Sequence, residues 1–372
     1  SSNICAILIR TSSNLTLKNL FFENMCYDAS ISGQVFDGTY GCNNIFIENW
    51  NDENGQMGVY ADSIDNFYIN NYTMKSDELV PGGFHMLYTA EGIGRARYNN
   101  IVLYGNETTD VAFDFAGYND REDINYQADI IVDGFEVTAN GLCAIKRSCK
   151  NITLRNGTFI LTDKLFENGT RGANGALSLT AASNDNGNVI YPAITVENVT
   201  FKQSENNLHE GYLYCTWDSS FGRYILKNCN IYNMSAQDRS KSYSGCLELY
   251  NCYILDELNR GIYKTFEEEL NNYQFETYCL MENCVVHISS ENYPMNNINS
   301  HCNLTIKNND IKRDQGTSLI FNANKNGGKI IASGNDYYGE HVTSQTAMLS
   351  GVSNSNITQY NNYVAGVLYE MS

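Results

Sequence analysis

The chain has 372 residues, and its 24 basic and 42 acidic side chains give a formal net charge of −18. A surface of this charge repels a phosphate backbone, so nucleic acid is not expected as a partner. No apolar run approaches the roughly 18 residues that a membrane-spanning helix needs, so membrane insertion is not expected either.

A short cassette, apolar-x-apolar-x-Asn-apolar-x-apolar, returns along the whole chain and is clearest at residues 15–22, 152–159 and 194–201. With its Asn as an anchor, the thirteen copies are centred on Asn19, Asn49, Asn71, Asn100, Gly134, Asn156, Asn198, Asn228, Asn251, Asn283, Asn308, Gly334 and Asn361. Asn and Gly enter the left-handed backbone region more easily than other residues. The cassette therefore predicts a bend at each anchor.

The residues four and two positions before an anchor are mostly apolar, as at Ile45 and Ile47, and they alternate with polar residues. Another apolar residue usually follows three positions after the anchor, as at Met74. This pattern predicts a one-sided strand, a one-residue bend and a second strand. A further strand is indicated after a Gly between cassettes, for example at residues 175–179.

A unit of this size cannot bury its own apolar face, whereas stacked copies share a continuous core. The expected fold is therefore an all-β solenoid of parallel strands, with about 13 coils of three strands each. We expect one domain over residues 1–372, with loop insertions near 104–128, 160–190 and 256–275, where the anchors are furthest apart. The chain opens with Ser1 and not with Met, so we expect a fragment of a longer protein.

The repeat pattern resembles the right-handed parallel β-helix of the pectin-lyase-like superfamily, which includes polysaccharide lyases, polygalacturonases and bacteriophage tailspikes. The resemblance rests on the cassettes at the thirteen anchors and covers nearly the whole chain. The Asp-Asp and Gly-His-Gly motifs of polygalacturonases are missing, so the chain looks most like a tailspike. A leucine-rich repeat is disfavoured because the intervals are irregular and lack helical segments.

The resemblance implies a protein that binds, and in its enzymatic form depolymerises, a bacterial surface polysaccharide as a glycoside hydrolase does. It also implies a homotrimer on a virion tail. A non-enzymatic adhesin or fibre shaft, at a bacterial surface or secreted, is an alternative from another class. A polysaccharide lyase is a third.

Three of the twelve cysteines, Cys229, Cys252 and Cys284, directly follow their anchors. In other coils an apolar residue such as Trp50 takes this position, so we expect it to face inward. Buried free thiols are the favoured interpretation, and disulfides between neighbouring coils are the alternative. Because there is no Cys-x-x-Cys pair and the five His are scattered, neither a metal nor another cofactor is expected.

Side chains inside a solenoid are needed for packing, so a functional site must lie on outward faces and loops. Asp62 and Glu91 each lie nine residues before an anchor on consecutive coils. If these offsets are kept, the two carboxylates stack at about 5 Å, the separation used by retaining glycosidases. Asp114 on the next coil completes the predicted catalytic set. The alternative is that these are solvated acids without chemistry.

Aromatic and basic residues near these acids are candidates for sugar binding. Arg147 again lies nine residues before an anchor and would neutralise an acidic sugar. Trp217 lies in a second aromatic segment, where a loop-packing role is the alternative. The predicted substrate-binding residues are Tyr60, Tyr88, Tyr118, Arg147, Tyr214, Trp217 and Asp218.

Overall fold

A computed structural model describes residues 5–24, 27–32, 41–55, 57–76, 84–107, 109–116, 129–146, 151–162, 164–165, 171–172, 175–180, 193–205, 211–217, 223–237, 246–258, 261–264, 277–289, 295–297, 302–316, 319–323, 328–347 and 356–369. These residues form strands and turns, and no helix occurs among them. The chain divides into unit 1 (Ser1–Thr195 and Ser204–His209) and unit 2 (Val196–Gln203 and Glu210–Ser372).

The strands of unit 1 are β1 (Cys5–Arg10), β2 (Ser13–Glu23), β3 (Tyr27–Ser32), β4 (Cys42–Glu53), β5 (Met57–Lys75), β6 (Phe84–Ile93), β7 (Arg95–Tyr104), β8 (Thr109–Ala116), β9 (Asp129–Ala139), β10 (Cys143–Lys146), β11 (Asn151–Leu161), β12 (Lys164–Leu165), β13 (Arg171–Gly172) and β14 (Gly175–Thr180). The boundary between the units falls within β15 (Ala193–Gln203).

Unit 2 contains β16 (Gly211–Trp217), β17 (Arg223–Lys227), β18 (Asn230–Tyr232), β19 (Met234–Gln237), β20 (Cys246–Tyr250), β21 (Tyr253–Asp256), β22 (Tyr263–Lys264), β23 (Thr277–Glu282), β24 (Val285–Ile288), β25 (Met295–Asn297), β26 (Cys302–Lys307), β27 (Asp310–Arg313), β28 (Phe321–Ala323), β29 (Ile330–Ser333), β30 (Asp336–Tyr338), β31 (Ile357–Tyr360), β32 (Tyr363–Val364) and β33 (Val367–Leu368).

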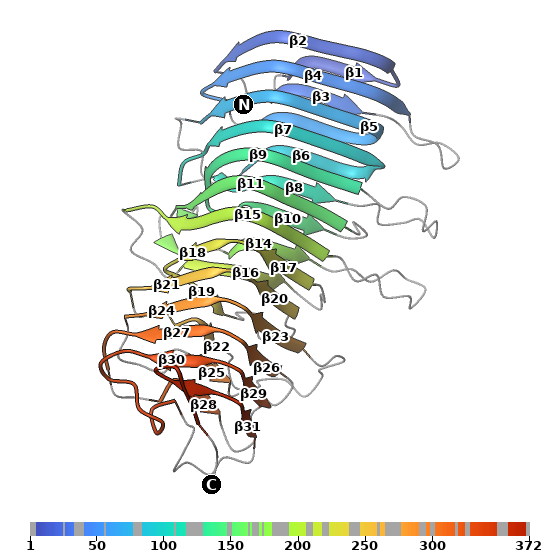
Figure 1. Cartoon of the computed structure of the whole chain (residues 1–372). Coiled ribbons are helices and arrows are strands. Elements are labelled where there is room, and N and C mark those ends of the chain that lie inside the picture. The colour runs from blue at the N-terminus through green and yellow to red at the C-terminus, as the bar shows by residue number, and fades with distance from the viewer. Residues whose placement is uncertain are drawn as a thin grey trace. The chain divides into compact units, whose positions relative to one another are not determined.

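The strands of unit 1 pair side by side in parallel (Figure 1). One series runs β2, β4, β5, β7, β9 and β11. A second series runs β1, β3, β5, β6, β8, β10 and β14, so the long β5 belongs to both. The short pair β12 and β13 is antiparallel. Unit 1 is thus largely a parallel sheet, which is consistent with the predicted β-solenoid.

Unit 2 is also built mainly of parallel strands. One parallel series runs β17, β20, β23, β26, β29 and β31, and a second runs β18, β21, β24, β27, β30 and β32. A third joins β16, β19, β22, β25 and β28. After β32 the chain turns at Ala365 (φ 49°) and Gly366 (φ 76°), and β33 returns antiparallel to β32.

Every predicted bend is present. The eleven Asn anchors have φ between 52° and 58°, and Gly134 and Gly334 have φ of 73° and 66°. The anchor amides also stack: Asn71 Nδ2 donates to Asn49 Oδ1 at 3.0 Å, and Asn100 Nδ2 donates to Asn71 Oδ1 at 3.1 Å. Asn is therefore favoured at the bends both by its backbone preference and by contacts between neighbouring strands.

The apolar positions of the cassette fill the interior, as predicted. Ile45 and Ile47 are 0% and 1% exposed, and Trp50, in the inward position after its anchor, is 2% exposed. The Trp50 ring packs against Tyr72, with 5.9 Å between ring centroids. Burying a large apolar side chain stabilises a fold by about 1.5–3 kcal/mol, so these rows supply most of the driving force for stacking.

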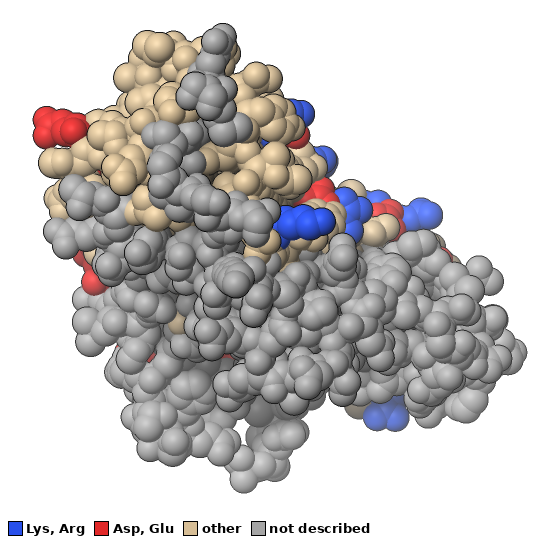
Figure 2. Space-filling model, turned by 90° about the horizontal axis from the view of Figure 1, so that it is seen from below, with Lys and Arg blue, Asp and Glu red and all other residues tan. Residues whose placement is uncertain are grey.

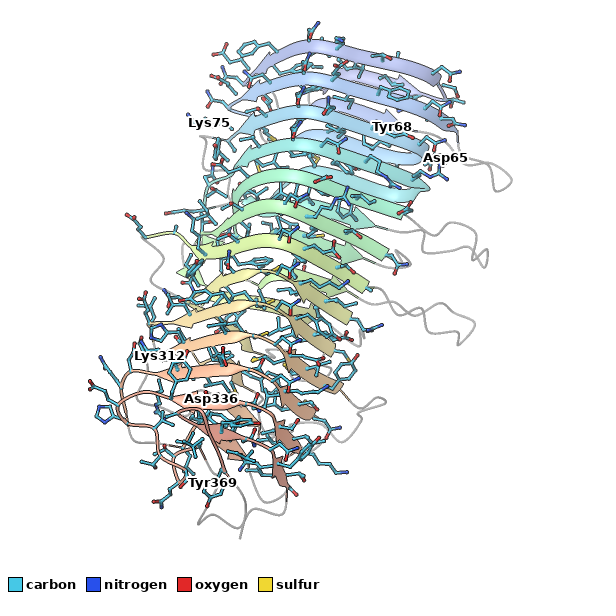
Figure 3. All side chains as sticks on the ribbon, in the orientation of Figure 1. Asp65, Tyr68, Lys75, Lys312, Asp336 and Tyr369 are labelled. Carbon is cyan, nitrogen blue, oxygen red and sulfur yellow. The ribbon has the colours of Figure 1, made fainter. Side chains whose placement is uncertain are left out.

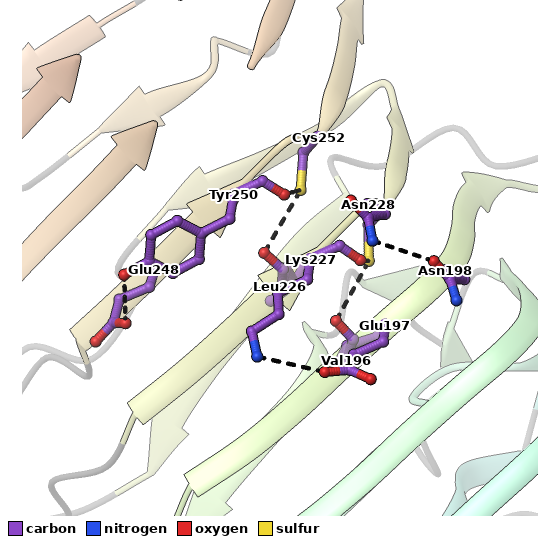
Figure 4. Close-up of polar contacts among 10 residues, drawn as sticks. Val196, Glu197, Asn198, Leu226, Lys227, Asn228, Glu248, Tyr250 and Cys252 are labelled. Carbon is purple, nitrogen blue, oxygen red and sulfur yellow. Dashed lines mark hydrogen bonds and ion pairs between the residues drawn. The ribbon is translucent and has the colours of Figure 1, made fainter. Parts of the chain in front are cut away.

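From Asn228 onward, the inward position after each anchor of unit 2 carries a Cys or an Asn, and we call these residues the interior row. Its members are Cys229, Cys252, Cys284, Asn309, Asn335 and Asn362, all buried. The three cysteines are free thiols, as the favoured interpretation predicted. Each thiol contacts a backbone carbonyl of the preceding strand, for example Cys252 Sγ and Leu226 O at 3.6 Å (Figure 4). The three asparagines, which the sequence pattern did not predict, make the corresponding contacts through their amides.

Candidate functional site

Three of the predicted site residues share one register position on consecutive strands of unit 1. Tyr60 on β5 pairs with Tyr88 on β6, and Tyr88 pairs with Asp114 on β8. The two neighbours of Tyr60 in sequence, Val59 and Ala61, are buried in the core, so Tyr60 faces outward by strand alternation. Neighbouring strands lie about 4.8 Å apart, so these three residues follow one another at that spacing. We call them the tyrosine row.

The predicted stacking of Asp62 on Glu91 is not present in the strand register. Asp62 pairs with Ala90, and the pairing shifts before it resumes at Ile64 and Ile93. The chain has one more residue between Ala90 and Ile93 than between Asp62 and Ile64, which is the mark of a β-bulge. Asp62 and Glu91 lie the same number of residues before their anchors, but because of the bulge they do not face each other across the strands.

The predicted site residues of this face differ in how deeply their side chains are buried. Tyr60 and Asp62 are half-buried, whereas Asp114 is 0% exposed although its neighbours Phe113 and Phe115 take the inward positions. The side chains of Tyr88, Glu91, Tyr214 and Trp217 lie outside the described residues, although their backbones belong to β6 and β16. Tyr118, Arg147 and Asp218 lie wholly outside them, as does most of each predicted insertion.

A second cluster, on the outer face of unit 2, was not predicted. Glu248 on β20 accepts hydrogen bonds at Oε1 from Arg223 Nε at 3.0 Å and from Arg223 Nη2 at 2.5 Å. The Tyr278 hydroxyl donates to the same oxygen at 2.5 Å, and the Tyr250 hydroxyl donates to Oε2 at 3.0 Å. We call these four residues the Glu248 cluster. Figure 4 shows the contact between Glu248 and Tyr250.

The hydrogen bonds of this cluster keep Glu248 ionised. Its side chain is 6% exposed, whereas that of Arg223 is 44% exposed. Burial alone would raise the pKa of Glu248, but hydrogen bonds from Tyr278, Arg223 and Tyr250 outweigh it and leave the pKa below its ordinary value. Burial, followed by the contact with Glu248, raises the pKa of Tyr278 and of Tyr250. At neutral pH Glu248 is thus an acceptor of hydrogen bonds and not a general acid.

A sequence signal for this cluster exists in the cassette itself. Glu248 lies three residues before its anchor, a position that carries no other acidic residue in the thirteen copies. Arg223 and Tyr278 each lie five residues before the neighbouring anchors. A comparison of outward positions between coils, in place of a search for paired acids, would have found all three.

Several charges on the outer faces form an ion pair with a neighbour on the next strand. Lys227 Nζ lies 3.3 Å from Glu197 Oε1, and Lys307 Nζ lies 3.1 Å from Glu282 Oε1. Figure 2 shows basic and acidic groups side by side on the described part of the visible face. Exposed ion pairs of this kind contribute about 0–1 kcal/mol each to stability. These two ion pairs join charges on strands close to the Glu248 cluster.

Two further groups of side chains lie on the outer faces. Tyr68 on β5, labelled in Figure 3, stacks on Phe46 of β4, with 4.8 Å between ring centroids and 6° between ring planes. In unit 2, Asp314 contacts both Lys312, at 2.9 Å, and His287. Both groups are satisfied by their own partners and present fewer convergent polar atoms than the Glu248 cluster.

Within the described parts of the chain, no group of three or more His, Cys, Asp or Glu is placed to hold a metal ion. No helix in those parts is long and apolar enough to cross a membrane. Comparison with family models, curated proteins and solved structures gives no match to this chain. The tyrosine row and the Glu248 cluster are therefore the features of this chain that bear on its function.

Proposed function

We propose that this chain is a right-handed parallel β-helix of the tailspike type that binds a bacterial surface polysaccharide through the tyrosine row. About 13 coils of three strands would account for the recurring bends and the parallel series. The observation that carries the proposal is the register of Tyr60, Tyr88 and Asp114 on three consecutive strands. The half-buried Tyr60 offers a sugar an aromatic face and a hydroxyl, and Asp62, two residues further along β5 and also half-buried, lies on the same side as a hydrogen-bond acceptor.

Binding is proposed ahead of cleavage, because the predicted acid pair is out of register. Hydrolysis that depends on Asp62, Glu91 and Asp114 is the enzymatic form of the proposal, and elimination by a lyase is the alternative to it. Against any polysaccharide that is cleaved, Asp62→Asn and Glu91→Gln should each lower the rate by about 100-fold or more if these acids act as general acid or base. Unchanged rates would remove both residues from the catalytic set.

The test is a panel of purified bacterial capsules and lipopolysaccharides, with binding measured by calorimetry and products by chromatography. Tyr60→Ala should weaken binding about tenfold, which corresponds to about 1.4 kcal/mol of lost contact. Tyr68→Ala is the matched control, because Tyr68 is also a half-buried tyrosine of β5 but lies outside the tyrosine row. Equal losses in the two variants, or no binding by the native chain, would overturn the proposal. Oligosaccharide release would indicate hydrolysis, and ultraviolet-absorbing products would indicate a lyase.

A homotrimer on a virion tail is part of the same proposal, since extended parallel sheets gain from a partner that covers an exposed face. Light scattering should then give three times the chain mass of 41.8 kDa. A monomer that still binds polysaccharide would favour the adhesin alternative, in which the solenoid presents its binding face without a tailspike assembly.

A further inference from the structure

The Glu248 cluster fixes the direction of the hydrogen bonds that it can offer to a ligand. An ionised carboxylate only accepts, so the hydroxyl hydrogens of Tyr250 and Tyr278 both point to Glu248. The two phenolic oxygens can then serve a ligand only as acceptors. Arg223 carries five N–H donors, of which Glu248 takes two, and its side chain is 44% exposed. The cluster thus presents oriented acceptors beside a cationic donor.

This arrangement discriminates between classes of ligand. A hydroxyl group can accept from Arg223 and donate to a phenolic oxygen, so two adjacent hydroxyls of a sugar match the cluster. A carboxylate or phosphate group can only accept, and it would meet two phenolic oxygens that have no hydrogen to give. Removing such a mismatched polar group from water without a partner is unfavourable.

The charges around the Glu248 cluster also favour a neutral ligand over an anionic one. Arg223 is balanced by Glu248 on the next strand, Lys227 is balanced by Glu197, and the chain as a whole carries a net charge of −18. The site therefore has no excess positive charge with which to attract an anionic sugar.

We propose that the Glu248 cluster is a second glycan-binding site, specific for a neutral pyranose with adjacent hydroxyls. Arg223, Tyr250 and Tyr278 contact the sugar, and Glu248 acts as a positioning residue that orients them. The inference shares the glycan class of ligand with the proposed function but rests on other residues, so the two can fail separately.

The electrostatics of the cluster predict how binding responds to pH and salt. The pKa of Glu248 is lowered and those of Tyr250 and Tyr278 are raised, so the hydrogen-bond directions stay fixed across neutral pH. Binding of a neutral sugar should thus be flat between about pH 6 and 9, because the ordinary pKa values of Glu and Tyr already lie near 4.3 and 10. It should also be insensitive to salt, since no net charge is neutralised.

The experiment measures binding of the full chain to neutral dextran, mannan and galactan and to the polyuronate alginate, at low and high NaCl. A neutral polymer should bind more tightly than alginate, and Tyr278→Phe should weaken that binding about tenfold. Glu136→Gln is the matched control, since Glu136 on β9 of unit 1 also accepts a hydrogen bond from a tyrosine hydroxyl, that of Tyr104 at 2.9 Å, and lies outside the cluster. Its affinity should equal that of the native chain.

Glu248→Gln should change which ligand is preferred, whereas a simple loss of packing would only weaken binding. The glutamine amide can donate to one phenolic oxygen, which turns that hydroxyl hydrogen outward, and the charge of Arg223 is no longer balanced. The preference should therefore shift from the neutral polymer toward alginate, and the alginate binding should become salt-dependent. If this variant does not fold, Tyr250→Phe and Tyr278→Phe decide the question.

Three outcomes would overturn the inference: alginate preferred by the native chain, no binding of any neutral polymer, or unchanged neutral binding in Tyr278→Phe and Glu248→Gln. A loss in Tyr60→Ala with none in the Glu248 cluster variants would support the proposed function and refute this inference. The reverse pattern would support this inference and remove the tyrosine row as the binding face.

Discussion

Asn309 accepts a hydrogen bond from the backbone N–H of Cys284, with 2.7 Å between Cys284 N and Asn309 Oδ1. The same relationship recurs along the interior row: Cys252 N donates to Cys284 Sγ at 3.4 Å, and Asn309 N donates to Asn335 Oδ1 at 3.0 Å. Each of these N–H groups directly follows a bend, where regular strand pairing is interrupted. The next side chain in the row takes the place of the missing strand partner.

Asn335→Ala should therefore destabilise the chain strongly. Asn335 Oδ1 accepts from both the backbone and the side chain of Asn309, and its amide donates to Ile306 O at 3.1 Å. Leaving these buried groups without partners should lower the free energy of unfolding by about 3 kcal/mol. Urea denaturation followed by circular dichroism would measure it. Cys252→Ala, which removes only weak thiol contacts, should lose about 1 kcal/mol, and an equal loss in both variants would contradict the role of the amides.

The anchors can be tested at Asn71, where two effects are separable. Asn71→Gly removes the amide contacts to Asn49 and Asn100 but keeps a residue that adopts the φ of 55°. Asn71→Ala removes the same contacts and also strains the left-handed bend by about 1–2 kcal/mol. The midpoint of urea unfolding should thus fall further for Ala than for Gly. The reverse order would mean that the bend is not the reason for Asn at this position.

Two glycines of unit 2 provide a matched pair. A Cβ added to Gly339 (φ 131°) would lie 1.9 Å from Arg313 O, whereas a Cβ on Gly366 (φ 76°) meets nothing within 4 Å. Gly366→Ala should lower the free energy of unfolding by about 1–2 kcal/mol through backbone strain alone. Gly339→Ala must also move a backbone carbonyl, so its unfolding midpoint should be clearly lower. Similar midpoints would show that the backbone near Arg313 yields easily.

The lowered pKa of Glu248 predicts a specific dependence of stability on pH. Because the pKa is lower in the folded chain, ionised Glu248 stabilises the fold above the unfolded value of about 4.3. This contribution is lost as the pH falls from there through the folded pKa. Glu248→Gln should have a shallower decline in the free energy of unfolding between about pH 5 and 3. An unchanged slope would contradict the ionised state of the cluster.

The bends and inward rows could be predicted because each depends on a few neighbouring residues. A left-handed φ at Asn71 and the burial of Ile45 both follow from local preference and alternation. The pairing of Tyr60 with Tyr88 did not follow from the same alignment, because Tyr60 lies eleven residues and Tyr88 twelve residues before their anchors.

The pairing of Asp62 could not be predicted in the same way. An extra residue before Ile93 shifts the register, and its effect depends on the neighbouring strand and not on local sequence. The Glu248 cluster was missed because its residues come from three coils and differ in charge and type. The asparagines of the interior row contradict the apolar pattern, and only the contacts between strands explain them.

The antiparallel return of β33 has a consequence for how molecules of this chain can associate. β32 has β30 on one side and β33 on the other, so both of its edges are paired. An unpaired strand edge is a template to which the strand of another molecule can add, and repeated addition produces fibrils. The two-residue turn at Ala365 and Gly366 covers this edge with β33, and because β33 has only two residues it is a poor template for the strand of another molecule.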